Sequence, residues 1–188
     1  MIKSEQNGRM LAYTSKEMLN EWKLRTQMVN YHRDCIVERE DGIDLDAVLL
    51  KKLNDIYERL LVEAPVEFLP VYDVAEDCAL SVNADLSAKV VLPEACVRVL
   101  ELKLTSWERG VTEFAKAHSR LAQLQESEWT RAGALHPVCV EGHRCLHVYS
   151  VREGVETKVE RLLAVCRRDA DSFEFSPVLW DDFMKFAD

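Results

Sequence analysis

Four residues in one short segment have the types that bind zinc: Cys139, His143, Cys145 and His147. Structural zinc sites use thiolate and imidazole ligands, normally four of them arranged in a tetrahedron. The segment that carries them, Pro137 to Val148, is predicted to be a β-hairpin. Whether the four side chains can meet on one ion therefore depends on how the two strands pair.

The register of this hairpin separates the candidate ligands. With the turn centred on Gly142-His143, Val140 pairs with Cys145. Side chains alternate between the two faces of a strand, so Cys145 and His147 share one face and Cys139 lies on the other. A four-ligand site would require the hairpin to open. We therefore expect an ordinary strand pair with no bound metal, and keep a zinc-dependent enzyme as an alternative hypothesis.

Other kinds of reactive site have no clear signature in the sequence. The chain contains no Gly-x-Ser-x-Gly elbow, no Cys-x-x-Cys pair and no glycine-rich phosphate loop. Two groups of acidic residues, Asp73 with Glu76 and Asp77, and Asp181 with Asp182, are typical of solvated faces and helix ends. We therefore predict no catalytic residue and no cofactor, and expect that the chain is not an enzyme.

Charge and composition narrow the functional classes further. The net charge is −9, whereas nucleic-acid binding normally needs a basic face. No stretch approaches the ~20 apolar residues of a membrane span, and the first residues lack the apolar core of a signal peptide. With no export signal, the six cysteines are expected to be free thiols. These features predict a protein of the cytoplasm that has no membrane partner.

Two helices are predicted in the N-terminal third. Thr14 and Glu17 have the spacing of a capping box before a helix from Ser15 to His32. A second helix begins near Leu45, carries a leucine-rich stripe and ends near Glu63, before Pro65. Joined by a short charged turn, the two helices are expected to form an antiparallel pair.

The middle of the chain is predicted to be rich in β-strands. Besides the hairpin, strands are expected over Lys89–Leu92, Val97–Leu104 and Lys158–Cys166. A change of phase predicts a bulge near Val99. A short helix is expected over 119–129, with Leu121 and Leu124 facing inward. For Trp107 and Trp129, packing in the core is one of two equally weighted interpretations.

The last residues are predicted to form a short helix that begins at Ser176-Pro177. Its apolar stripe consists of Leu179, Trp180, Phe183 and Met184. A short helix at a chain end is marginal alone and needs a surface to pack on, either its own sheet or a partner. These four residues are therefore the predicted protein-interface candidates.

Together these elements predict an α+β fold with an N-terminal antiparallel helical pair, a small, mostly antiparallel β-sheet with a hairpin, and a short C-terminal helix. Residues 1–13 are expected to be a flexible arm, and residues 14–188 a single domain. Within that domain we expect a helical hairpin over 14–64, a β-rich part over 65–175 and a terminal docking helix over 176–188.

Two segments of the chain resemble head–tail connector (adaptor) proteins of tailed bacteriophages. The first runs from Val91 to Trp107, and its Leu92-Pro93, Arg98 and following tryptophan are similar to an element of that family. The second is Gln125–Arg131, with its Trp-Thr-Arg end, followed by Pro137–Val140. The predicted order of elements also agrees, although many adaptors end in longer helices than this chain does.

The resemblance implies a structural role in the virion. Connector proteins form a closed ring, commonly about twelve-fold, through repeated contacts between neighbouring copies. Such a ring lies under the portal protein, extends the DNA channel and provides the surface for the tail-side ring or tail proteins. DNA would then be a passing contact without sequence specificity. The implied location is the portal region of the virion, and the cytoplasm of the infected bacterium during assembly.

Another function fits the same residues. A small cytoplasmic interaction module would bind one partner through its C-terminal helix and would be a monomer or dimer, whereas a connector forms a large ring.

Overall fold

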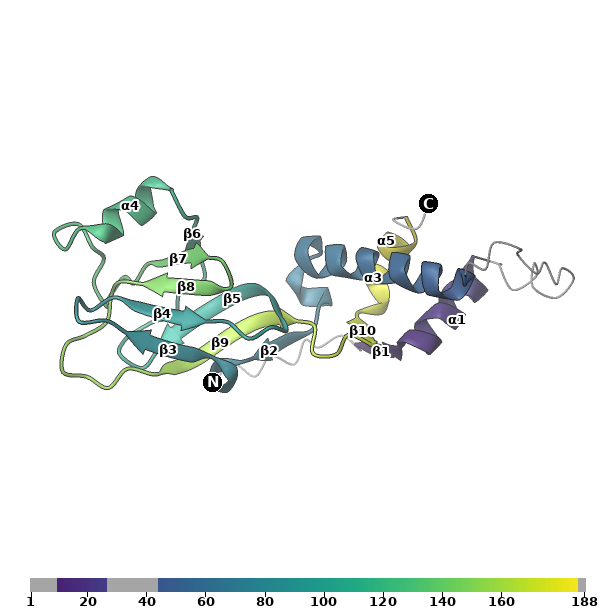
Figure 1. Ribbon diagram of the computed structural model, residues 1–188, viewed down its shortest axis with the longest axis horizontal. Coiled ribbons are helices and arrows are strands. Elements are labelled where there is room, and N and C mark those ends of the chain that lie inside the picture. The colour runs from purple at the N-terminus through teal and green to yellow at the C-terminus, as the bar shows by residue number, and fades with distance from the viewer. Residues whose placement is uncertain (1–9, 27–43, 186–188) are drawn as a thin grey trace, which may run out of the picture. The chain divides into compact units, whose positions relative to one another are not determined.

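The computed structural model describes residues 10–26 and 44–185 of this mixed α/β protein (Figure 1). The chain divides into two compact units, at residues 70 and 166. Residues 1–70 together with 167–188 form one, here called the helical unit, and residues 71–166 form the other, here called the β unit. The boundaries expected at residues 64 and 175 thus differ from those of the structure, because the first and last parts of the chain share one core.

The helical unit contains three α-helices and two strands among its described residues. They are β1 (Leu11–Thr14), α1 (Ser15–Arg25), α3 (Leu45–Glu63), β10 (Ser172–Phe175) and α5 (Trp180–Lys185), with 3-10 turns at Val66–Phe68 and Pro177–Leu179.

Local capping explains where the first two helices begin. The Thr14 hydroxyl accepts a hydrogen bond from the Glu17 backbone N–H at 3.3 Å, and the Glu17 carboxylate accepts one from the Thr14 N–H at 2.9 Å. This confirms the predicted capping box. The Asp44 carboxylate accepts from the Asp46 N–H at 3.0 Å and begins α3 in the same way. The expected extension of α1 to His32 lies outside the described residues.

Strands β1 and β10 were not predicted. They pair antiparallel, with Leu11 opposite Phe175 and Thr14 opposite Ser172. Leu11 to Tyr13 therefore belong to a strand and not to the flexible arm expected over 1–13, whose first nine residues lie outside the described part. The two strands come from opposite ends of the chain, and a sequence pattern as short as four residues gives no sign of so distant a partner.

An aromatic cluster forms the core of the helical unit. Tyr57 of α3 packs against Phe173, with ring centroids 5.1 Å apart. Its hydroxyl donates to the Glu174 carbonyl at 3.0 Å and accepts from the Glu174 N–H at 2.9 Å. The Arg167 guanidinium lies 5.4 Å from the Tyr57 ring and donates to Glu58 at 3.2 Å. These contacts attach α3 to the strand that returns from the far end of the chain.

The β unit is a sandwich of two sheets. Its elements are β2 (Val71–Asp73), β3 (Ala79–Val82), β4 (Ala88–Val91), β5 (Cys96–Leu104), β6 (Phe114–Ala115), α4 (Arg120–Glu126), β7 (Cys139–Gly142), β8 (Cys145–Val148) and β9 (Val159–Cys166), with a 3-10 turn at Ala75–Asp77. One sheet has the order β3-β4-β8-β7-β6 and the other β2-β9-β5. Figure 1 shows α4 beside β6 and β7, and Ala122 of the helix packs with Ala115 and Val140 of these strands.

Apolar side chains from both sheets fill the space between them. Val90 and Val148 come from the five-stranded sheet, and Leu102, Leu104 and Leu162 from the three-stranded one; all are buried. The long β5–β9 pair shows register shifts, one of them between Val99 and Glu101, which confirms the predicted bulge. The sandwich gives the loops between its strands a rigid base.

Removing the Phe183 ring should destabilise the helical unit. The side chain is 0% exposed and stacks on Phe175 with centroids 5.6 Å apart. Phe183→Ala is therefore expected to lower the free energy of unfolding by about 3–5 kcal/mol. Val178→Ala, at a position that is 62% exposed, is the control and should change it by less than about 0.5 kcal/mol. Urea unfolding measures both; equal effects would show that α5 is not part of the core.

The stability of the helical unit should fall at high pH through Tyr57. Burial raises the pKa of this phenol to about 12, whereas an unfolded tyrosine titrates near about 10. Between these values the unfolded chain binds fewer protons than the folded one, so the free energy of unfolding decreases as pH rises, by roughly 3 kcal/mol in total. Urea titrations across this range should show a shallower decline for Tyr57→Phe. Parallel curves for the two proteins would contradict the assignment.

Candidate functional site

The predicted interface residues of the terminal helix lie inside the helical unit. Leu179, Trp180 and Phe183 are buried, and Met184 is partly buried. Trp180 packs edge-on against Phe175 of β10, with centroids 5.3 Å apart. The stripe therefore packs on the chain's own strand, and these residues are not available as a docking surface on the described unit. Trp180 and Phe183 are part of the aromatic core of the helical unit.

The hairpin has a different register from the predicted one but the same faces. Its turn is His143-Arg144, so Val140 pairs with His147, and not with Cys145 as expected. The difference is an even number of residues, which leaves every side chain on its predicted face. Cys145 and His147 are neighbours on one face, with Sγ and Nε2 3.6 Å apart.

Cys139 is separated from that thiol–imidazole pair by the sheet itself. It is fully buried among the apolar side chains between the two sheets. Burial raises the pKa of the Cys139 thiol to about 12, which keeps it protonated and unsuited to binding a metal. Within residues 10–26 and 44–185, no three histidine, cysteine or acidic side chains are arranged to hold a metal ion.

Helix α4 presents large apolar side chains to solvent. The helix spans Arg120–Glu126, and the Ser119 hydroxyl caps it by accepting from the Ala122 N–H at 3.2 Å. The prediction that Leu121 and Leu124 face inward is wrong: both are exposed, and the buried residues are Ala122 and Gln125. The short helix packs through small side chains on Ala115 and Val140 of β6 and β7.

The segment after α4 folds back and satisfies the carbonyls at the end of the helix. The Thr130 hydroxyl donates to the Leu124 carbonyl at 2.6 Å, and Arg131 Nε donates to the Gln125 carbonyl at 3.0 Å. The Gln125 side chain donates to the Leu121 carbonyl at 3.2 Å and accepts from the Ala132 N–H at 2.9 Å. The last carbonyls of a helix have no partner within it, so these bonds fix both the helix end and the loop.

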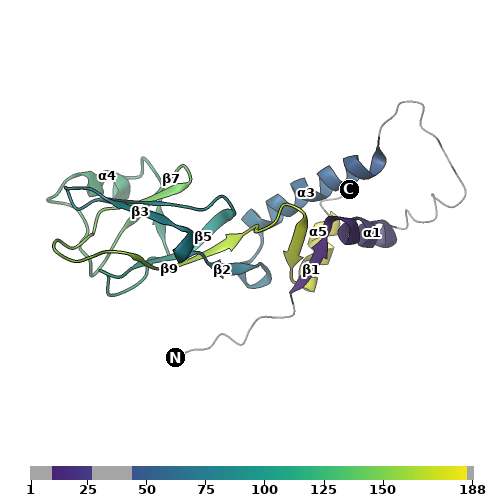
Figure 2. The same ribbon diagram turned by 60° about the horizontal axis from the view of Figure 1, so that its bottom comes forward.

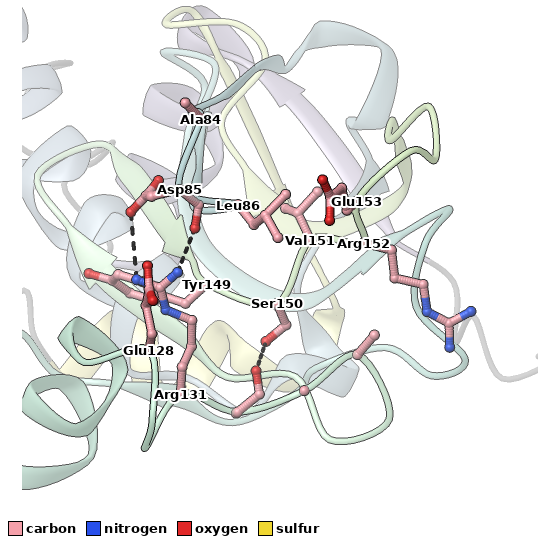
Figure 3. Close-up of a pocket in the computed structure, with 13 residues that line it drawn as sticks. Ala84, Asp85, Leu86, Glu128, Arg131, Tyr149, Ser150, Val151, Arg152 and Glu153 are labelled. Atoms are coloured by element: carbon pink, nitrogen blue, oxygen red, sulfur yellow. Dashed lines mark hydrogen bonds and ion pairs between the residues drawn. The ribbon is translucent and has the colours of Figure 1, made fainter.

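Arg131 attaches this loop to the rest of the sandwich (Figure 3). Its guanidinium donates to the Asp85 carbonyl at 2.6 Å and lies 3.6 Å from the Asp85 carboxylate, in the turn between β3 and β4. It also lies 5.4 Å from the Tyr149 ring. Hydrogen bonds from the Ser87 hydroxyl and N–H, with a smaller contribution from Arg131, lower the pKa of Asp85. The Arg131 side chain thus contacts the end of α4, the turn that contains Asp85, and Tyr149.

Trp129 belongs to this loop and directly precedes Thr130, whose hydroxyl bonds to the helix end. Its side chain is 95% exposed, so the core-packing alternative for Trp129 is wrong. We call Trp129, Leu121 and Leu124 the α4 surface. The sequence does carry a signal for this exposure, because polar residues flank the tryptophan on both sides, Glu126-Ser127-Glu128 before it and Thr130-Arg131 after it. Tryptophan is enriched among the residues that contribute most to binding between proteins.

The other internal tryptophan connects the two segments that carry the connector resemblance. Trp107 is buried, in agreement with the core-packing alternative, and its Nε1 donates to the Ser150 carbonyl at 3.0 Å. The Ser150 hydroxyl donates to the Ala132 carbonyl at 2.8 Å, directly after Arg131 (Figure 3). Trp107 and the Trp-Thr-Arg segment are therefore parts of one hydrogen-bonded structure, although they lie far apart in the sequence.

An open groove of about 520 Å³ lies next to this loop. Its walls include Leu86, Arg131, Tyr149 and Val151 (Figure 3). Glu128, which directly precedes Trp129 in the sequence, also lines the groove. Leu86 has a φ of 62°, a left-handed conformation that is unusual for leucine. The groove is bordered by charges of both signs, which suits a contact with a protein surface.

No protein-family model matches the chain, and no curated protein matches it. Among the described residues, none of the helices combines the length and the apolar character that crossing a membrane requires.

Removing the Arg131 side chain should destabilise the β unit and the position of its loop. The side chain is 12% exposed, and its loss leaves the Gln125 and Asp85 carbonyls without these donors. Arg131→Ala is expected to cost roughly 1–3 kcal/mol in urea unfolding. Arg131→Lys should not restore it, because one ammonium cannot reach both carbonyls as the guanidinium does.

Arg152 provides the matched control for this substitution. It borders the same groove, is half exposed and pairs with Glu108 at 3.6 Å. Arg152→Ala should change the free energy of unfolding by less than about 1 kcal/mol. A loss as large as that of Arg131→Ala would show that Arg131 has no special structural role.

Proposed function

We propose that the chain is a structural virion protein of a tailed bacteriophage. In this proposal it forms a ring at the portal vertex, joins the head to the tail and extends the DNA channel. Its partners are neighbouring copies of itself, the portal protein and tail-side proteins, and it performs no catalysis. The support comes from the resemblance of Val91–Trp107, Gln125–Arg131 and Pro137–Val140 to connector proteins.

The observation that carries the proposal is a hydrogen-bonded connection between the first two of these segments. Trp107 is linked through Ser150 to Ala132, and Arg131 attaches the same loop to the sandwich. A resemblance made of unrelated short matches would be expected to fall on scattered parts of a fold. Here Trp107 of the first segment is linked through Ser150 to Ala132, the residue directly after the second segment, which contains the exposed Trp129.

The order of the elements along the chain supports the proposal, since two helices precede the β unit, as the resemblance to connectors implies. Lys23 near the end of α1 forms an ion pair of 2.6 Å with Asp46 at the start of α3. This contact is compatible with the expected helical pair. In the proposed ring the helical unit precedes and follows the β unit along the chain, and DNA contacts the ring only in passing.

Charge favours an apolar contact between the copies of such a ring. Each chain carries a net charge of −9, so neighbouring copies repel one another unless their contacts compensate. The α4 surface offers Trp129, Leu121 and Leu124 as apolar groups that are already exposed. Ring closure needs a heterologous contact, in which this surface meets a different surface of the next copy.

The interaction module that binds through its C-terminal helix is not favoured by the structure. Three of its four contact residues, Leu179, Trp180 and Phe183, already pack within the helical unit. We therefore assign the candidate contact to the β unit and not to α5.

Substituting Trp129 should weaken ring assembly without unfolding the chain. A tryptophan at the centre of an interface contributes about 2 kcal/mol or more, so Trp129→Ala should raise the dissociation constant between neighbours roughly 30-fold or more. Size-exclusion chromatography with light scattering, performed on the protein alone and with a candidate portal protein, measures the assembly.

Val155→Ala is the control, because it shortens an exposed apolar side chain of the same unit that does not belong to the α4 surface. It should leave the assembly unchanged. A protein that remains monomeric or dimeric at every concentration and also with the portal would contradict the proposed function.

A further inference from the structure

Three cysteines of the β unit lie close together at one end of the sandwich. Cys96 is the first residue of β5, and Cys166 is the last residue of β9. Cys78, just before β3, packs against the same core cluster and is near enough to Cys166 and Cys96 to interact with both electrostatically. The described thiols of Cys139 and Cys145 lie on the opposite faces of the hairpin, outside this group.

Cys96 and Cys166 occupy directly opposed positions on antiparallel strands. Opposed Cα atoms in such strands are about 4.5–5.5 Å apart, and disulfides span Cα separations of about 4.4–6.8 Å. The two thiols are already in hydrogen-bond contact. Strands β5 and β9 run side by side in both views (Figures 1 and 2). A covalent bond between these sulfurs therefore needs little movement of the backbone.

We propose that Cys96 and Cys166 form a cross-strand disulfide when the protein reacts with a small-molecule disulfide such as oxidised glutathione. Cys96 reacts first, because it is partly exposed whereas Cys166 is buried. Its thiol gives up a proton, and the sulfur attacks the reagent, which forms a mixed disulfide and releases one glutathione.

The second step closes the bond. The Cys166 thiol loses its proton, and its sulfur attacks Sγ of Cys96, releasing the second glutathione. Two protein thiols are oxidised and one glutathione disulfide is reduced to two glutathione thiols, so atoms and electrons balance.

The surroundings of the pair make this reaction slow in a reducing compartment. The hydrogen bond with Cys166, together with burial, holds the pKa of Cys96 above its usual range and so lowers its thiolate fraction. If the proposed function holds, the thiols stay reduced during assembly in the cell, and the bond forms in the released particle, where the medium is oxidising. This timing rests on the proposed function, but the disulfide itself does not.

The bond would connect two positions that are far apart in the sequence of the β unit, although they face each other in the fold. It closes a loop from Cys96 to Cys166 that contains β5, α4 and the hairpin, and a crosslink over such a long loop restricts the unfolded chain strongly. We therefore expect the oxidised β unit to melt at a higher temperature than the reduced one, and the difference to disappear on treatment with dithiothreitol.

The direct test is a peptide map of the full chain. Cys35 lies outside the described residues, so Cys35→Ser is used as the background to prevent its pairing. Trypsin should release Cys96 in the peptide 90–98 and Cys166 in 162–167, apart from Cys78 in 60–89. After oxidised glutathione, the intact protein should be lighter by two hydrogen atoms, and the first two peptides should appear joined. Unmodified or only glutathionylated cysteines, or a bond to Cys78, would overturn the proposal.

Two variants separate the pair from the other thiols. In Cys166→Ala, Cys96 should stop at the mixed disulfide with glutathione, because no second thiol faces it across the strands. Cys139→Ala, the control at another buried cysteine, should leave the joined peptides unchanged. Ring assembly measured in reductant is independent of this result, so failure of the ring and failure of the disulfide are distinguishable.

Discussion

The arrangement of the candidate surface depends on one constraint: the end of α4 has to find partners for its backbone carbonyls. The helix is only two turns long, and the carbonyls of its last turn have no partner within the helix. Thr130 and Arg131 donate to the Leu124 and Gln125 carbonyls, and in doing so they bring the chain back over the helix end. Because Arg131 also bonds to Asp85, the loop is fixed to the sandwich, and Trp129 is presented on a rigid support.

Much of the local structure could be predicted from the sequence because the interactions that decide it are local. The capping box of Thr14 and Glu17, the extent of α3 and the bulge near Val99 all depend on residues a few positions apart. The β1–β10 pair could not be predicted, since its partners are separated by almost the whole chain. The hairpin illustrates both cases: its faces follow from alternation, but its turn position depends on details of the loop.

The candidate contact was harder to predict because hydrophobicity alone does not say which surface an apolar residue covers. Leu121 and Leu124 are the most apolar residues of α4, yet the sheet beneath accepts the small side chain of Ala122 and the polar one of Gln125. Trp180 and Phe183 suggest an adhesive stripe, yet a small unit with few large side chains uses them internally. The sequence identifies the apolar residues, whereas packing in the folded chain decides which of them remain exposed.

The path of the chain has a consequence for the evolution of this protein. The β unit begins at Val71 and ends at Cys166, and Val71 pairs with Val165, so its entry and exit are adjacent strands. The helical unit has a strand pair of its own, formed by β1 and β10. A segment whose two ends meet can be exchanged for another of similar spacing without breaking the fold that carries it. Recombination can thus replace the β unit while the helical unit is kept, and so change the surface that the β unit presents.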